Sequence, residues 1–180
     1  MVLQKLMDST QDGHSRRVSL ISGLLAEKAG YPKAEIEIIT QAALLHDVGK
    51  IAIPGYILNK PSGLTPDEYE IIKSHTTTGY KQLNEAARIL ALAAVAARQH
   101  HEHTDGYGYP DGINGSEIHP YSKLIAVADV FDALYSRRAY KEPWEIERIR
   151  AYFTEQAGKQ FDRELAMLLL SIIADVQAVY

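Results

Sequence analysis

The sequence predicts an all-α fold in one compact domain. Three observations carry this prediction: apolar residues recur at helical spacing along most of the chain, no stretch alternates convincingly between apolar and polar residues, and glycines and prolines gather in a few segments between the helical patterns. With 180 residues, 46% of them hydrophobic and 23% charged, the chain can build one core but leaves little room for a second domain.

Two amphipathic helices are predicted to open the domain, over residues 18–29 and 36–45, with Gly30-Tyr31-Pro32 as the break between them. From residue 51 to residue 66, three prolines and two glycines exclude a long helix. Thr65-Pro66-Asp67-Glu68 is typical of a capped helix start, so a short helix is expected to run from there towards His75.

The second half of the chain is predicted to add four longer helices. Residues 79–101 are rich in Ala, Leu, Gln, Glu and Arg, which favours one long helix that ends at the pair His100-His101. Residues 104–120 are predicted to form a loop, and helical patterns return over residues 122–137, 144–156 and 162–179. The expected domain has about seven helices within residues 11–180, and residues 1–10 are interpreted as a stub, the end of a linker from a larger signalling protein.

Composition and charge exclude several classes of protein. There is no cysteine, so disulfides and thiolate metal sites are excluded and any metal must be held by nitrogen and oxygen ligands. The longest apolar stretch, residues 89–97, is too short to span a bilayer, and the N-terminus lacks the apolar segment of a signal peptide, which predicts a soluble, cytoplasmic protein without a membrane segment. A net charge of −4 argues against duplex nucleic acid as the main partner.

Metal-ligand side chains stand together where predicted helices end. In the run Leu44-Leu45-His46-Asp47-Val48-Gly49-Lys50, an imidazole and a carboxylate are adjacent, and a lysine follows. Neighbouring residues of a helix point about 100° apart, so His46-Asp47 and the later pair His100-His101 each suit two adjacent metals better than one. We therefore expect a two-metal centre.

Single histidines and aspartates on the other helices have two interpretations. His14, His75 and Asp132, taken one at a time, are equally well explained as polar groups at helix edges. Taken together, five histidines and two aspartates on otherwise apolar helices would cost several kcal/mol as unpaired buried groups unless something binds them. A metal cluster satisfies all of them.

Basic residues near these positions suit an anionic substrate. Lys50 follows His46 by one helical turn. A lysine at this position can stabilise the C-terminus of a helix, but the neighbouring metal-ligand candidates favour a contact with a phosphate. Arg137, Arg138 and Lys141 are either a solvated basic patch or the local positive charge that an acidic protein needs for a phosphodiester. We favour Arg138 and Lys141 as substrate contacts.

Five motifs in combination resemble those of one family. They are His14-Ser15-Arg16-Arg17-Val18, Ala43-Leu44-Leu45-His46-Asp47-Val48-Gly49-Lys50-Ile51, His100-His101-Glu102, Asp105-Gly106-Tyr107-Gly108-Tyr109-Pro110 and Val127-Ala128-Asp129-Val130-Phe131-Asp132-Ala133-Leu134. This set resembles the HD-GYP domain, a bacterial branch of the HD phosphohydrolases, and the resemblance runs from about residue 8 to about residue 165.

The resemblance implies an all-helical enzyme that hydrolyses cyclic di-GMP to linear pGpG or to GMP. It implies these metal ligands: His14, His46, Asp47, His75, His100, His101 and Asp129. It also implies phosphate contacts from Lys50, Arg138 and Lys141. The loop Gly108-Tyr109-Pro110 would border the site, where Tyr109 would contact the substrate and the loop would meet a GGDEF-type cyclase domain.

The expected cofactor is a pair of divalent metal ions. Histidine and carboxylate ligands favour iron or manganese, with zinc, nickel and magnesium as alternatives. Thr10 stands one turn before His14, where some family members carry a glutamate that supports a third metal, so two metals are expected rather than three. Asp47 and a hydroxide would bridge the metals, the hydroxide would attack the phosphate, and Lys50 would neutralise a phosphate oxygen.

Two other functions stay open on the sequence. One is an HD phosphohydrolase of another nucleotide, such as a cyclic GMP-AMP or a mononucleotide. The other is a non-catalytic module that binds the dinucleotide or a cyclase domain, against which the complete set of ligands argues. A homodimer is a further arrangement compatible with the sequence.

Overall fold

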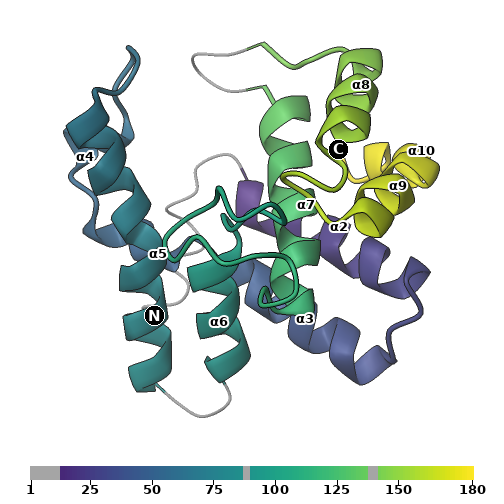
Figure 1. The fold of residues 1–180 in the computed structure, drawn as a ribbon, viewed down its shortest axis with the longest axis horizontal. Helices are drawn as coiled ribbons and strands as arrows, with labels where there is room; N and C mark the ends of the chain where they lie inside the picture. Colours follow the sequence, from purple (N-terminus) through teal and green to yellow (C-terminus); the bar gives the residue numbers. More distant parts are fainter. Residues whose placement is uncertain (1–12, 87–89, 138–141) are drawn as a thin grey trace.

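The computed structural model describes residues 13–86, 90–137 and 142–180, and in these residues the protein is helical without a β-sheet. Figure 1 shows their order: α2 (His14–Lys28), α3 (Lys33–Leu45), the 3-10 helix η1 (Val48–Ala52), α4 (Gly55–Leu58), α5 (Pro66–Ala86), α6 (Ala91–Gln99), α7 (Pro120–Tyr135), α8 (Ile146–Gln156), α9 (Arg163–Ser171) and α10 (Ile173–Gln177). The all-α prediction is confirmed.

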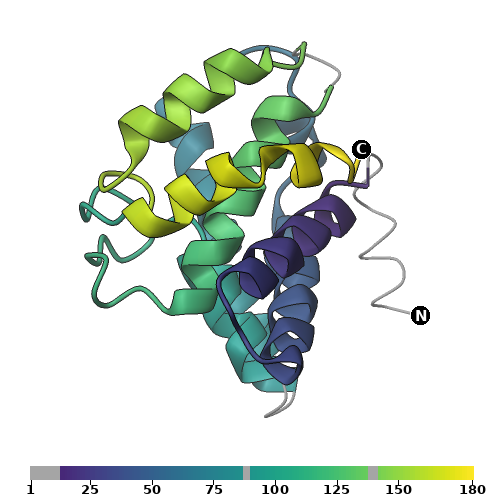
Figure 2. The same cartoon turned by 90° about the vertical axis from the view of Figure 1, so that its right-hand side faces the viewer.

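Helix α7 is the central helix of the domain (Figure 1). It is strongly apolar, and Leu124, Ile125 and Phe131 are completely buried. Helices α2, α3 and α6 pack against it, and so do α8 and α9. Figure 2 shows α8, α9 and α10 grouped together on one side of α7. Because α7 touches most other helices, a side chain on it can meet residues from distant parts of the sequence.

Helix α5 begins where the sequence predicts a capped start. The hydroxyl of Thr65 accepts the backbone N–H of Glu68 at 3.2 Å, and the Glu68 carboxylate accepts the backbone N–H of Thr65 at 2.8 Å. These two bonds form a reciprocal capping box, which satisfies N–H groups that have no partner within the helix. Pro66 occupies the first helical position, where its missing N–H costs nothing.

The prediction of one helix over residues 79–101 is wrong. Helix α5 continues past Gly79 to Ala86, and a separate helix, α6, begins at Ala91 and packs back against α5 (Figure 1). Alanine-rich sequence favours helix on both sides of the break, so composition alone did not reveal it. An unbroken helix of that length would separate its ends by roughly 33 Å at 1.5 Å per residue. The break instead brings the end of α6 beside the middle of α5.

The other differences from the prediction concern short elements. The segment from residue 51 to residue 66, where the sequence excludes a long helix, contains the end of η1 and the short helix α4. The helix expected over residues 162–179 is divided into α9 and α10 at Ile172. Ile173 and Val176 of α10 are buried, so the division lets the last turn pack on the core.

The predicted stub, residues 1–10, lies outside the described residues. Within those residues, no helix has the length and hydropathy needed to cross a bilayer.

Candidate metal centre

The structure brings all seven predicted ligands together. They come from the first turn of α2, the ends of α3 and α6, the middle of α5 and the buried face of α7. Their ligand atoms form two groups, in each of which all atoms lie within 4.8 Å of one another: Asp47, His75, His100 and His101 in one, and His14, His46 and Asp129 in the other. Six of the seven side chains belong to buried residues, and His101 is half-buried.

The carboxylate of Asp47 lies between the two groups. Its Oδ1 is 3.4 Å from Nε2 of His75 and 3.8 Å from Nε2 of His100. Its Oδ2 is 3.3 Å from Nε2 of His46 and 3.7 Å from Nε2 of His14. One oxygen therefore faces each group, which is the arrangement expected of a bridging carboxylate.

Gly49 allows η1 to approach α5 closely enough for this contact. A Cβ atom on Gly49 would lie 2.0 Å from the carbonyl oxygen of His75 and 2.6 Å from the backbone nitrogen of Gly79. Such distances are far inside van der Waals contact, and both neighbours are backbone atoms of a helix. Only glycine fits here, and the fit holds Asp47 beside His75.

Backbone carbonyls fix the orientation of three imidazoles. The Nδ1 atoms of His46, His75 and His100 each lie next to a carbonyl oxygen three or four residues earlier, at 2.6, 2.6 and 3.1 Å. A carbonyl oxygen only accepts, so each Nδ1 carries the proton. Each Nε2 then presents its lone pair to the centre, which is the usual arrangement of a histidine that binds a metal.

His14 is oriented by a carboxylate instead. Its Nδ1 lies 2.8 Å from Oδ2 of Asp132, which is completely buried on α7. Asp132 also accepts from Nε of Arg17 at 2.6 Å, from the hydroxyl of Ser136 at 3.0 Å and from the hydroxyl of Tyr180 at 2.6 Å. Asp132 therefore orients the imidazole of His14 and belongs to neither group of candidate ligands.

The acidic surroundings of His14 favour its protonated form. Burial by itself would lower the pKa of His14, but its hydrogen bonds with Asp129, Asp132 and Asp47 outweigh this and hold the pKa well above the usual value. Burial would likewise raise the pKa of Asp47 and of Asp129, but neighbouring cationic groups hold both pKa values well below the usual range. The carboxylates are ionised and ready to bind a cation.

The three imidazoles that share a group with Asp47, those of His75, His100 and His101, favour the neutral form. Burial, followed by the repulsion of neighbouring imidazoles, lowers the pKa of His100 well below the usual value. Burial is also the largest cause that lowers the pKa of His75, and of His101 to about 4. Neutral imidazoles are the form that binds metals.

Two buried polar atoms indicate whether the side chains of the centre are suited to bind a metal ion. Nε2 of His46 and Oδ1 of Asp47 are buried and have no hydrogen-bond partner among the described residues. Leaving such atoms unpaired costs free energy, and both point into the centre. A cation at these atoms would satisfy them, and a set of nitrogen and carboxylate ligands without thiolates suits divalent transition metals. The donor set therefore fits a metal pair.

One expectation about adjacent residues is corrected. His100 and His101 fall into the same group, whereas His46 and Asp47 fall into different ones. The angle of about 100° between neighbours applies only within a helix. Helix α6 ends at Gln99, so His101 lies beyond it, and the rings of His100 and His101 have centroids only 4.1 Å apart.

The predicted substrate contacts are placed in part. The ammonium of Lys50 forms an ion pair with Oδ2 of Asp47, so it lies at the edge of the centre. The ring of Tyr109 lies against that of His101, with centroids 4.8 Å apart. Burial raises the pKa of Tyr109, so its hydroxyl stays protonated. Arg138 and Lys141 lie outside the described residues.

A buried glutamate holds the loop that carries Tyr109. Glu102 is 3% exposed, and its carboxylate accepts the backbone N–H groups of Asp111 at 2.7 Å, Gly112 at 3.2 Å and Ile113 at 3.2 Å. Gly108 lets the loop fold back on this residue, since a Cβ there would lie 2.4 Å from the Cα of Glu102. Glu102 was quoted in a motif, but its role in the loop was not predicted, because its partners are backbone groups.

The two remaining histidines lie elsewhere. His119 caps the start of α7, where its Nδ1 accepts the backbone N–H of Tyr121, and His103 is near Asp105 in the loop. The fold and this site define a class of protein: an all-helical domain with a buried centre of five histidines and two carboxylates.

The chain belongs to the HD domain family. The sequence model of that family, described as "HD domain", matches residues 2–165. This confirms the family recognised from the motifs. In fold, the chain is similar to Bd1817, an HDG"Y"P protein from Bdellovibrio bacteriovorus, with a TM-score of 0.72 at 22% identity over 91% of this chain and 52% of that one.

Three curated relatives are more similar in sequence. The cyclic di-GMP phosphodiesterase response regulator RpfG of Xanthomonas campestris pv. campestris is 44% identical over 91% of this chain and 43% of its own length. A cyclic di-GMP phosphodiesterase of Thermotoga maritima is 41% identical over 99% and 49%. The 3′3′-cGAMP-specific phosphodiesterase 2 of Vibrio cholerae is 42% identical over 87% and 30%. The chain thus spans less than half the length of each of these relatives.

Proposed function

We propose that this chain is a metal-dependent phosphodiesterase domain that hydrolyses cyclic di-GMP to linear pGpG, to GMP or to both. The observation that carries the proposal is the position of Asp47, with one carboxylate oxygen facing each group of histidines. Relatives named as cyclic di-GMP phosphodiesterases support the choice of substrate.

The metal ions would be held in two places by the chain's own residues. His75, His100 and His101 would hold one ion, His14, His46 and Asp129 the other, and Asp47 would bridge them. The chemistry that such ions supply is a nucleophile at neutral pH, through the lowered pKa of bound water, and compensation of charge on the phosphate. We propose iron or manganese as the native metal on the nature of the ligands.

The chain's remaining contribution is to bind and orient the diester. Lys50 would exchange part of its ion pair with Asp47 for a contact with a phosphate oxygen, because both lie at the edge of the centre. Tyr109, protonated and stacked near His101, would donate a hydrogen bond to the substrate. Arg138 and Lys141 are proposed as further phosphate contacts because the resemblance to the HD-GYP domain implies this role.

The test combines metal content with turnover. We expect about two metals per chain in the purified protein, and loss of cyclic di-GMP when the assay is run without oxygen and with iron or manganese supplied. His46→Ala and Asp47→Ala should lose metal and turnover together. Lys50→Ala should keep the metal and lower turnover by about 10²-fold or more, since it removes one charge contact to the reacting phosphate. Wild-type metal content and turnover in either of the first two variants would show that the assignment is wrong.

A second substrate is favoured by one relative. The similarity to a 3′3′-cGAMP-specific phosphodiesterase is nearly as high as that to RpfG. The same assay should therefore compare cyclic di-GMP with cyclic GMP-AMP at equal concentration. Faster loss of cyclic GMP-AMP would transfer the proposal to that substrate, and binding of either without turnover would favour the non-catalytic module.

Other parts of the prediction concern the whole protein. We propose that the loop Gly108-Tyr109-Pro110 is the surface that would meet a GGDEF-type cyclase domain, and that the domain acts in the cytoplasm. A homodimer remains a prediction, which sedimentation of the purified chain would test. Residues 1–10 are proposed to join the domain to a preceding part of a longer protein.

A further inference from the structure

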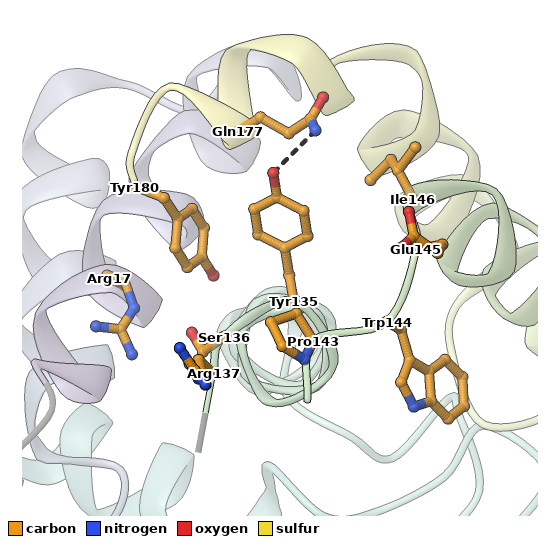
Figure 3. A pocket seen from close by; sticks show the side chains of 10 residues that line it. All are labelled: Arg17, Tyr135, Ser136, Arg137, Pro143, Trp144, Glu145, Ile146, Gln177 and Tyr180. Carbon is orange, nitrogen blue, oxygen red and sulfur yellow. Dashed lines mark hydrogen bonds between the residues drawn. The ribbon is translucent and has the colours of Figure 1, made fainter. Parts of the chain in front are cut away.

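A cavity lies at the C-terminal end of α7, apart from the predicted ligands. Its volume is about 530 Å³, and none of the seven metal-ligand candidates lines it. Figure 3 shows its lining, which comes from α2, the end of α7, the start of α8 and the last residues of the chain. The volume is typical of sites that bind small molecules.

One wall of the cavity is cationic. Arg17 and Arg137 both lie there, and Figure 3 shows Arg137 beside Ser136 with Arg17 to their left. The guanidinium of Arg137 pairs with Glu142 at 3.3 Å, but both side chains are 78% exposed. An exposed pair of this kind contributes little free energy, so an incoming anion can replace the carboxylate. Guanidinium groups bind phosphate and carboxylate through two parallel hydrogen bonds.

The opposite wall is largely apolar. It is formed by Tyr135, Pro143, Trp144 and Ile146, with Glu145 between the last two, and Figure 3 shows Tyr135 and Pro143 between Arg137 and Trp144. The amide of Gln177 closes the top, where it donates to the hydroxyl of Tyr135 at 3.0 Å. Flat aromatic molecules pack well on such surfaces.

The cavity is connected to the metal centre through Asp132. Arg17, Ser136 and Tyr180 all line the cavity, and all three donate hydrogen bonds to the carboxylate of Asp132. Asp132 also contacts His14, whose Nδ1 lies 2.8 Å from its Oδ2. A molecule in the cavity can therefore contact groups that set the charge and position of this carboxylate.

We propose that this cavity is a second ligand site, which takes a planar aromatic molecule bearing a phosphate or carboxylate group, and that its occupant acts on the metal centre through Asp132. The anion would lie at Arg17 and Arg137, and the flat ring against Tyr135 and Trp144. When the anion shares the guanidinium of Arg17, Asp132 loses part of one of its hydrogen bonds. Its carboxylate then binds the Nδ1 side of His14 more tightly, which holds the imidazole in place and strengthens metal binding.

Direct binding can be measured in the metal-loaded protein, because Trp144 is the only tryptophan of the chain. We would titrate GMP and benzoate, with guanosine and inorganic phosphate as the separate halves of GMP. GMP should change the tryptophan fluorescence saturably, and each half should bind at least tenfold more weakly. If neither GMP nor benzoate gives a saturable change, the proposal is wrong.

Variants locate the binding. Arg137→Ala removes the exposed cation and Gln177→Glu adds a negative charge from a different helix, so each should weaken GMP binding by about tenfold. Arg16→Ala is the matched control, since Arg16 is exposed and does not line the cavity. Retention of GMP binding in both Arg137→Ala and Gln177→Glu would place the nucleotide elsewhere and overturn the proposal.

The connection to the metal centre has its own measurement. Metal loss to an excess of chelator should be about fivefold slower with saturating GMP, the lower end of the usual range for coupled sites. The effect should disappear in Arg137→Ala, whereas GMP bound directly to the metals would still slow the loss in that variant. An equal rate with and without GMP would show that the two sites are not coupled, and would overturn that half of the proposal.

Discussion

Replacing Glu102 by Gln tests how the loop that carries Tyr109 is held. In the wild-type protein one carboxylate accepts three backbone N–H groups, from Asp111, Gly112 and Ile113. A glutamine oxygen can keep the two bonds that Oε1 makes. Its NH₂ group, however, must face the N–H of Ile113, so that bond is lost and two donors oppose each other.

The magnitude follows from these bonds. Leaving one partly buried N–H without an acceptor costs about 1–3 kcal/mol. The two bonds that remain lose the charge of the acceptor, and charge-assisted bonds are roughly twice as strong as neutral ones. We expect a loss of about 3 kcal/mol in the free energy of unfolding. For a domain of this size, that lowers Tm by roughly 6–12 °C.

Thermal unfolding and amide hydrogen exchange of residues 105–113 are the assays. Glu117→Gln is the matched control, since Glu117 lies nearby and also accepts a backbone N–H, from Asn114 at 3.3 Å, but is exposed. The control should change the free energy of unfolding by no more than about 0.5 kcal/mol. If Glu102→Gln had the same Tm and the same loop protection as the wild type, the role given to this glutamate would be wrong.

Three further predictions concern the metal centre. Gly49→Ala should separate η1 from α5 and lower metal content to below one per chain by elemental analysis, while Gly63→Ala, with open space around it, should not. Asp132→Asn should weaken metal binding by about 10–100-fold in a chelator competition, and an unchanged affinity would contradict its role. Because the pKa of His14 is raised, it carries a proton in the metal-free protein at pH 7. Metal binding should therefore release that proton in calorimetry with two buffers, and metal affinity should rise with pH until the pH passes this pKa. No proton release at pH 7 would refute the assignment.

The motifs of the sequence supplied a list of candidate ligands but not the arrangement that brings them together. Residue types and spacing pointed to a two-metal centre, the resemblance to the HD-GYP domain implied the set of seven, and the structure places their ligand atoms in two groups. The break between α5 and α6 was not predicted, because Ala-rich sequence favours helix on both sides of it. In one continuous helix, the Nε2 atoms of His75 and His100 could not lie 3.4 Å apart.

The supporting residues were harder to predict for a different reason. Asp132 was identified as a polar group at a helix edge or a member of a metal cluster, but the sequence could not show that it faces His14 rather than the centre. Tyr180, which donates to it, follows a helix that is divided at Ile172, and no glycine or proline marks that break in the sequence. Contacts between residues far apart in sequence, 48 positions in this pair, depend on packing that no local pattern records.

The candidate metal centre joins five helices, and this affects the stability of the domain against unfolding. The outermost candidate ligands, His14 and Asp129, are separated by 115 residues along the chain, and the other five lie between them. Bound metals would therefore close several long loops at once, and closing long loops removes more entropy from the unfolded chain than closing short ones. In a chain without cysteine, the centre would serve as the cross-link that disulfides provide in other proteins, so that a chelator would act on this domain as a reducing agent acts on those.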